Sequence, residues 1–163
     1  MTGQSTDPTV RKTITVEVPA ERAFTVFTEQ MGSWWPLEDK SIGSAPAATV
    51  VVEPRAGGRW YERGVDGSES DWGHVLAYEP PSRLLLSWQI SADWRYDATL
   101  RTEVEVRFVA EGDHRTRVEL EHRGLEAYGE RSGQMQAIFD SPDGWRGILD
   151  AFSAKTTSPP PGG

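Results

Sequence analysis

The sequence contains no cysteine, which excludes disulfide bonds and every reaction that needs a thiolate. It also lacks an apolar run near the roughly 20 residues that a membrane-crossing helix requires. The first eight residues are polar and lack the apolar core of a secretion signal. We therefore expect a protein of the reducing cytoplasm that does not insert into a membrane.

Basic residues are outnumbered: 17 Lys and Arg stand against 25 Asp and Glu, for a formal net charge of −8. Because phosphate backbones bind to basic surfaces, this balance argues against a nucleic-acid partner. Only three histidines are present, and no carboxylate or third ligand stands at a metal-binding spacing. Glycine-rich phosphate loops and Ser-His-Asp motifs are absent as well. The sequence thus predicts no nucleic-acid partner, no metal and no other cofactor.

Tryptophan, by contrast, is abundant, with seven in 163 residues. Trp60, Trp72 and Trp88 stand in consecutive aromatic-rich runs separated by Gly, Asp, Ser and Pro, the residues typical of turns. We interpret residues 57–88 as a three-stranded antiparallel meander. Each tryptophan can pack in the core, but as a group they can also line a cavity for an apolar or aromatic ligand.

The segments before the meander alternate between strand and helix patterns. Residues 13–18 alternate polar and apolar side chains, as a half-buried strand does. A helix start follows, and Phe24, Phe27 and Met31 form one apolar stripe along that helix. A second short helical turn is expected after it, followed by a loop and by a β-branched strand over residues 48–53.

After the meander, residues 100–108 and 115–122 alternate strictly and predict two long strands joined by a hairpin turn. The outward charged residues of these strands are expected to form solvated ion pairs. The last third changes to a helical period. There Ser141 is the expected cap of a helix whose apolar stripe begins at Trp145 and ends at Phe152.

Together these patterns predict an α+β fold. Its expected elements are a curved antiparallel sheet of about six to seven strands wrapped on a long C-terminal helix, and two short helices after the first strand. One domain over residues 10–155 is expected between flexible tails at residues 1–9 and 156–163. Space between the helix and the sheet would form a pocket.

Several short motifs resemble a known family. In chain order they are Trp34-Trp35-Pro36, Gly57-Gly58-Arg59-Trp60, Trp72-Gly73-His74-Val75, Glu79-Pro80-Pro81-Ser82-Arg83-Leu84 and Gly144-Trp145. With these motifs, residues 10–155 resemble the SRPBCC (START-like, helix-grip) superfamily. Within it, the chain is similar to the bacterial branch that resembles the activator of heat-shock-protein-90 ATPase.

The resemblance implies the helix-grip fold, in which a deep cavity lies between the long helix and the sheet. The superfamily uses this cavity for lipids, sterols, polyketides and other apolar molecules. The run Ser141-Pro142-Asp143 departs from the smoother helix of the family. We expect this departure to affect the kink of the helix and the mouth of the pocket.

We therefore predict a non-catalytic module that binds a small hydrophobic or aromatic molecule in the cavity. The candidate residues for ligand contact are Phe27, Trp34, Trp35, Trp60, Trp72, His74, Trp88, Val104, His122, Met135, Trp145 and Leu149. Trp34 and Trp35 could each anchor the short helix or gate the pocket, and we expect one residue in each role.

Other functions remain as alternatives. An enzyme resembling the cyclases and dehydratases of the superfamily could use His74 or His122 as its acid–base group. A chaperone-interacting protein of the stress response, or a homodimer, would instead present a protein-binding surface. Arg59 could bind an anionic head group, but an ion pair with Glu62 or Glu79 is the expected arrangement. No residue is assigned a catalytic role.

Overall fold

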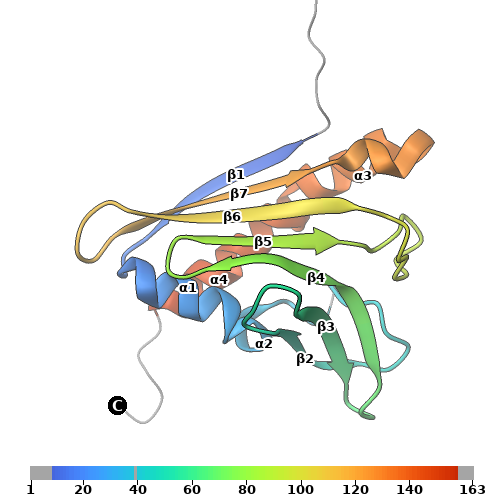
Figure 1. The fold of residues 1–163 in the computed structure, drawn as a ribbon, viewed down its shortest axis with the longest axis horizontal. Helices are drawn as coiled ribbons and strands as arrows, with labels where there is room; N and C mark the ends of the chain where they lie inside the picture. Colours follow the sequence, from blue (N-terminus) through green and yellow to red (C-terminus); the bar gives the residue numbers. More distant parts are fainter. Residues whose placement is uncertain (1–8, 39, 158–163) are drawn as a thin grey trace, which may run out of the picture.

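A curved sheet of seven antiparallel strands is the main element of the computed structural model, which describes residues 9–38 and 40–157 (Figure 1). The strands are β1 (Val10–Val16), β2 (Ala47–Val52), β3 (Arg59–Gly64), β4 (Glu69–Glu79), β5 (Arg83–Trp88), β6 (Thr102–Ala110) and β7 (Thr116–Arg123). Their order across the sheet is β1-β7-β6-β5-β4-β3-β2. Strands β2 to β7 therefore form a meander, and β1 pairs with β7 at one edge. The predicted α+β class and antiparallel sheet are confirmed.

The outer face of β5, β6 and β7 holds a network of ion pairs with Glu105 at its centre. The carboxylate pairs with Arg83, Arg107 and Arg123, and only 6% of the side chain is exposed. Burial by itself raises the pKa of this carboxyl, but hydrogen bonds from Arg83 and Arg123, with the charge of Arg107, lower the pKa to about 2. The prediction that the outward charges are all solvated is therefore wrong for Glu105.

Two short helices follow β1, as the sequence predicts. The first, α1 (Ala20–Thr28), turns its apolar stripe toward the core. The second, α2 (Met31–Trp34), is a single turn. Trp34 Nε1 donates a hydrogen bond to the Val26 carbonyl at 2.7 Å, and this bond fixes α2 against α1.

The C-terminal helix is present, as predicted, and it is interrupted close to the run Ser141-Pro142-Asp143, where the sequence predicts a change in its kink. Its parts are the 3-10 segment η1 (Leu125–Arg131), the helix α3 (Ser132–Asp140), the π-helical turn η2 (Pro142–Arg146) and the helix α4 (Gly147–Thr157). The interruption falls at Gly144, whose φ of −87° and ψ of −131° are not helical. Ser141 does not cap the following turn with its side chain. Its hydroxyl donates instead to the Ile138 carbonyl at 2.8 Å.

Helix α4 reaches Thr157, two residues beyond the expected domain boundary at residue 155. Thr156 is buried, so the expected flexible tail does not begin at residue 156. The remaining parts of the two expected tails, residues 1–8 and 158–163, lie outside the described residues.

The core lies between the sheet and the helices, and α4 runs behind the sheet in Figure 1. Helix α4 contacts α1 and β1. The apolar stripe predicted for the last helix is buried, and its members are Trp145, Ile148, Leu149 and Phe152. Within the described residues, no helix is both long and apolar enough to cross a membrane.

Candidate functional site

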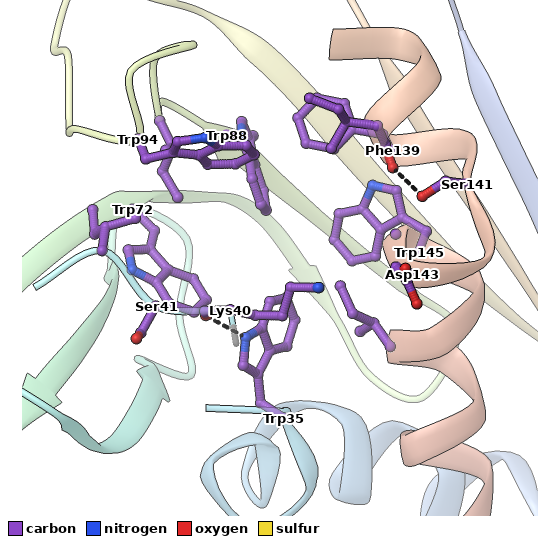
Figure 2. Close-up of a pocket in the computed structure, with 15 residues that line it drawn as sticks. Trp35, Lys40, Ser41, Trp72, Trp88, Trp94, Phe139, Ser141, Asp143 and Trp145 are labelled. Atoms are coloured by element: carbon purple, nitrogen blue, oxygen red, sulfur yellow. Dashed lines mark hydrogen bonds between the residues drawn. The ribbon is translucent and has the colours of Figure 1, made fainter. Parts of the chain in front are cut away.

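A cavity of about 390 Å³ opens between the sheet and the helical segment 138–148. Six of the fifteen lining residues are aromatic, and Figure 2 shows their rings around the space: Trp35, Trp72, Trp88, Trp94, Phe139 and Trp145. The other lining residues are Lys40, Ser41, Ile42, Ile90, Ile138, Ser141, Asp143, Gly144 and Ile148. This volume and this wall suit a small organic ligand, because binding sites for such ligands span roughly 300 to 1,000 Å³ and are mostly apolar.

A bulge in β4 turns Trp72 toward the cavity. Trp60 on β3 pairs with Gly73, and the register shifts after Trp60, so that Trp72 is the extra residue. Gly73 is required here, because a Cβ atom would lie 1.8 Å from the carbonyl oxygen of Ser87 on β5. The position of Trp72 in the wall therefore depends on the close approach of β4 and β5.

Glu62 is a buried carboxylate that fixes one side of the cavity, with 1% of the residue exposed. Its Oε1 atom accepts hydrogen bonds from Trp72 Nε1 at 2.9 Å and from the Ile42 N–H at 2.6 Å. Its Oε2 atom accepts one from the Gly43 N–H at 3.0 Å. These bonds join a wall tryptophan to the loop that supplies Ser41 and Ile42 to the wall.

Sequence reasoning missed this role of Glu62, which it considered only as a partner of Arg59. The signal was the spacing, because Glu62 stands two residues after Trp60 and therefore points to the same inner face of β3. A carboxylate on an inner face needs several donors, and the loop after α2 provides them.

Arg59 has partners other than the expected ones. Its guanidinium donates to Asp71 at 2.7 Å and to Glu69 at 3.1 Å. The expected ion pair with Glu62 or Glu79 is therefore wrong. Arg59 lies on the outer face of β3 and is absent from the cavity wall.

Replacing Glu62 by glutamine is expected to lower the free energy of unfolding by about 1 to 2 kcal/mol, because the amide nitrogen would face an N–H donor and leave it unpaired. Chemical denaturation measures this change. The matched control is Glu130→Gln, in an exposed position of η1, which should change the free energy by less than about 0.5 kcal/mol. Equal stability of the two variants would contradict the role of Glu62.

His122 lies behind Trp145 in a chain of hydrogen bonds. Trp145 Nε1 donates to His122 Nδ1 at 3.0 Å. Because Nδ1 is the acceptor, the neutral ring has its proton on Nε2, which lies 2.9 Å from Thr102 Oγ1 and donates to it. The Thr102 hydroxyl in turn donates to the Trp88 carbonyl at 2.9 Å. Two tryptophan residues of the wall are thus connected through one histidine.

These contacts give His122 a positioning role. Burial lowers the pKa of His122 to about 3, so its ring is neutral at physiological pH. Both ring nitrogens are occupied, by Trp145 and Thr102, and His122 is not among the residues that line the cavity. The ring orients Trp145 and is not placed to exchange a proton with a molecule in the cavity.

His74, the other candidate acid–base group, lies on the outer face of the sheet. Its Nδ1 atom is 3.0 Å from Gln89 Oε1, and its backbone N–H donates to Ser87 Oγ at 2.8 Å. Ser87 and Gln89 alternate along the chain with Trp88, which faces inward, so they point away from the cavity. His74 is therefore separated from the cavity by the sheet.

Four of the twelve candidate residues line the cavity: Trp35, Trp72, Trp88 and Trp145. Six others are buried in the core without lining it: Phe27, Trp34, Trp60, Val104, Met135 and Leu149. The remaining two are the histidines. Between the adjacent tryptophans, Trp34 anchors α2, whereas Trp35 forms part of the wall.

Trp94 lies at the mouth of the cavity and was missed by sequence reasoning (Figure 2). It is 42% exposed, and its neighbour in the wall, Ile138, is 36% exposed. Its φ of 63° is uncommon for an aromatic residue. The loop holds this conformation through a bond from the Trp94 N–H to the Ser91 carbonyl at 2.9 Å, and through an ion pair of Asp93 with Arg131 at 2.9 Å.

Charged side chains in the wall are Lys40 and Asp143. They approach the cavity from opposite sides in Figure 2, Lys40 from the loop after α2 and Asp143 from η2. Within the described part of the chain, no group of three or more His, Cys, Asp or Glu residues could hold a metal ion. The wall is therefore mainly apolar and rich in aromatic rings, with one charge of each sign.

Comparisons with known proteins agree with this architecture. A family model described as "Activator of Hsp90 ATPase homolog 1-like protein" matches residues 17–155. A solved structure of an anthrahydroquino-gamma-pyrone synthase, Txn09, complexed with SUM, is 36% identical over 91% of this chain and 96% of that chain, with a TM-score of 0.63. CalC from Micromonospora echinospora, described as a self-sacrificing resistance protein, is 32% identical over 92% and 94%, with a TM-score of 0.68.

A more distant structure, an HSP90 activator from Plasmodium falciparum, is 19% identical over 71% of each chain, with a TM-score of 0.50. At this identity the likeness concerns the fold alone. A comparison with curated protein sequences gave no significant match.

Proposed function

The chain belongs to the family of activator of Hsp90 ATPase homolog 1-like proteins, and from this premise we propose that it binds a planar aromatic molecule in its cavity. The main support is the wall, where six aromatic side chains surround about 390 Å³. Each ring that stacks on a ligand, or meets it edge to face, contributes about 0.5 to 1.5 kcal/mol beyond the burial of apolar area. Such a wall favours flat aromatic molecules over flexible chains.

The wall is fixed before a ligand arrives. Three wall indoles donate their N–H groups within the protein: Trp35 to the Lys40 carbonyl, Trp72 to Glu62 and Trp145 to His122. Rings held in this way lose little conformational freedom on binding, which lowers the entropic cost of association. Because these three N–H groups are occupied, these three indoles offer ring faces and edges to a ligand.

The neutral probe N-phenyl-1-naphthylamine is expected to bind to one site per chain, and Trp94→Ala is expected to weaken this binding about fivefold, because loss of one stacked ring costs about 1 kcal/mol. A fluorescence titration gives the Kd of each variant, and calorimetry gives the stoichiometry. Val65→Ala is the matched control, since Val65 is an exposed apolar residue outside the cavity. The proposal fails if the probe does not bind or if both variants weaken it equally.

A second candidate function is synthesis of an aromatic polycycle. The observation in its favour is the 36% identity to a protein whose printed name is anthrahydroquino-gamma-pyrone synthase. In this chain the ionisable side chains in the wall are Lys40 and Asp143, and His122 is neutral with both nitrogens occupied. Catalysis here would therefore depend mainly on holding the substrate in a reactive shape. NMR spectra of an aromatic polyketide precursor recovered after incubation with the protein separate the two functions, because a synthase changes its covalent structure whereas a binding protein returns it unchanged.

Activation of a chaperone receives less support. It rests on the family description and on a structure that is 19% identical, which concerns the fold alone. We therefore do not extend the proposal to a chaperone partner. A cytoplasmic location and a homodimer remain predictions from the sequence.

A further inference from the structure

Lys40 places a positive charge in the wall of the aromatic-rich cavity, and the residue is half-buried. Its backbone is fixed on both sides. The Lys40 N–H donates to the Pro36 carbonyl at 3.0 Å, and the Lys40 carbonyl accepts the Trp35 indole N–H at 2.9 Å. Figure 2 shows the side chain extending across the cavity toward the helix that bears Trp145. The backbone position from which this cation extends is therefore set by the fold.

Within residues 9–38 and 40–157, no acidic side chain forms an ion pair with Lys40. Lys12 on β1 shows the contrasting case, since its ammonium pairs with Asp140 at 2.7 Å. Asp143 lines the same cavity, but it is exposed and no bond joins it to Lys40. A half-buried ammonium that forms no ion pair with the described acidic residues gains a charge-assisted hydrogen bond when an anionic oxygen enters the cavity.

We propose that the ligand is an aromatic anion whose oxyanion, a phenolate or a carboxylate, binds the Lys40 ammonium while its rings occupy the aromatic cavity. The inference rests on the proposed function and names the chemical class of its ligand. A lysine suits this task because its ammonium is a point charge with rotatable N–H donors. It can therefore donate hydrogen bonds to a phenolate or to a carboxylate.

A matched pair of probes tests the charge directly. 8-Anilinonaphthalene-1-sulfonate has the skeleton of N-phenyl-1-naphthylamine with an added sulfonate, so the two differ by one anionic group. Lys40→Met removes the charge and keeps a similar apolar length. It is expected to weaken the sulfonate probe about tenfold and to change the neutral probe by less than about twofold. Displacement of one probe by the other shows that both occupy the same cavity.

Three further variants control for net charge and for the other wall charge. Lys155→Met removes a lysine of α4 that lies outside this cavity, and both Kd values should stay within about twofold of the native ones. Lys40→Arg restores the charge and should restore most of the affinity for the sulfonate probe. Asp143→Asn removes the opposing charge and should tighten the sulfonate probe alone.

The outcomes separate the two proposals. If the neutral probe does not bind, the proposed function fails. If the neutral probe binds but Lys40→Met changes both probes by the same factor, or leaves the sulfonate probe unaffected, the role of Lys40 fails and the proposed function stands. A selective loss of the sulfonate probe that Lys40→Arg reverses supports the inference.

Discussion

Replacing Gly73 by alanine is expected to lower the free energy of unfolding by at least about 3 kcal/mol, the largest effect of any substitution considered. An added Cβ would lie 1.8 Å from the Ser87 carbonyl oxygen and 2.8 Å from its carbon, both of them backbone atoms of the adjacent strand. Relief requires β4 and β5 to separate where Trp72 and Trp88 enter the wall. Chemical denaturation measures the loss, and weaker binding of the neutral probe should accompany it.

The control is Gly133→Ala in α3. A Cβ at Gly133 meets no atom within 4 Å, and alanine favours a helix over glycine by about 1 kcal/mol. This variant should therefore be as stable as the native protein or slightly more stable. A Gly73→Ala variant with the stability of Gly133→Ala would show that the two strands do not approach as described.

Acid is expected to destabilise the protein by about 3 kcal/mol between pH 7.5 and pH 4.5, because of His122. Burial lowers the folded-state pKa of His122 to about 3, whereas the unfolded chain has the ordinary value near 6.5. Below pH 6.5 the unfolded state binds a proton that the folded state does not. Stability is therefore lost by about 1.4 kcal/mol for each pH unit between 6.5 and 3.

Glu105 adds to this loss at lower pH. Its folded-state pKa is lowered to about 2 from an ordinary value near 4.5, so its contribution is present above pH 4.5 and disappears as the pH falls toward 2. Denaturation at several pH values gives the slope. NMR of the imidazole nitrogens shows whether His122 causes this slope, because its ring should have a proton on Nε2 alone and stay neutral at pH 5. Titration of His122 near pH 6.5 would overturn the prediction.

The sequence predicted the structure best in segments whose apolar residues recur with the period of a strand or a helix. Alternation along the strands predicts the meander and places Trp72 and Trp88 on its inner face, and helical spacing predicts that Trp145 is buried. The interruption at Gly144 was harder to place. A Cβ there would lie 2.4 Å from the Phe139 carbonyl oxygen, which is a contact between successive turns that spacing alone does not reveal.

The candidate site was less accessible to sequence reasoning, because much of it comes from loops. Trp94 and Lys40 lie in segments whose apolar residues show neither a strand period nor a helix period. The Trp94 N–H donates to the Ser91 carbonyl, and the Lys40 carbonyl accepts the Trp35 indole N–H. Strand alternation predicts that both His74 and His122 lie near inward-facing positions, but only His122 faces inward. Whether it meets a ligand or a neighbour depends on the orientation of Trp145, which is set by tertiary packing.

The packing of the tryptophans also has an optical consequence. Six of the seven indoles form a continuous network with ring centroids 5.1 to 6.5 Å apart: Trp34, Trp35, Trp60, Trp72, Trp88 and Trp145. At such separations, light absorbed by one indole migrates to the others before emission. Excitation energy is therefore shared among the six indoles. A light-absorbing molecule in the cavity would also quench the fluorescence of indoles that it does not contact.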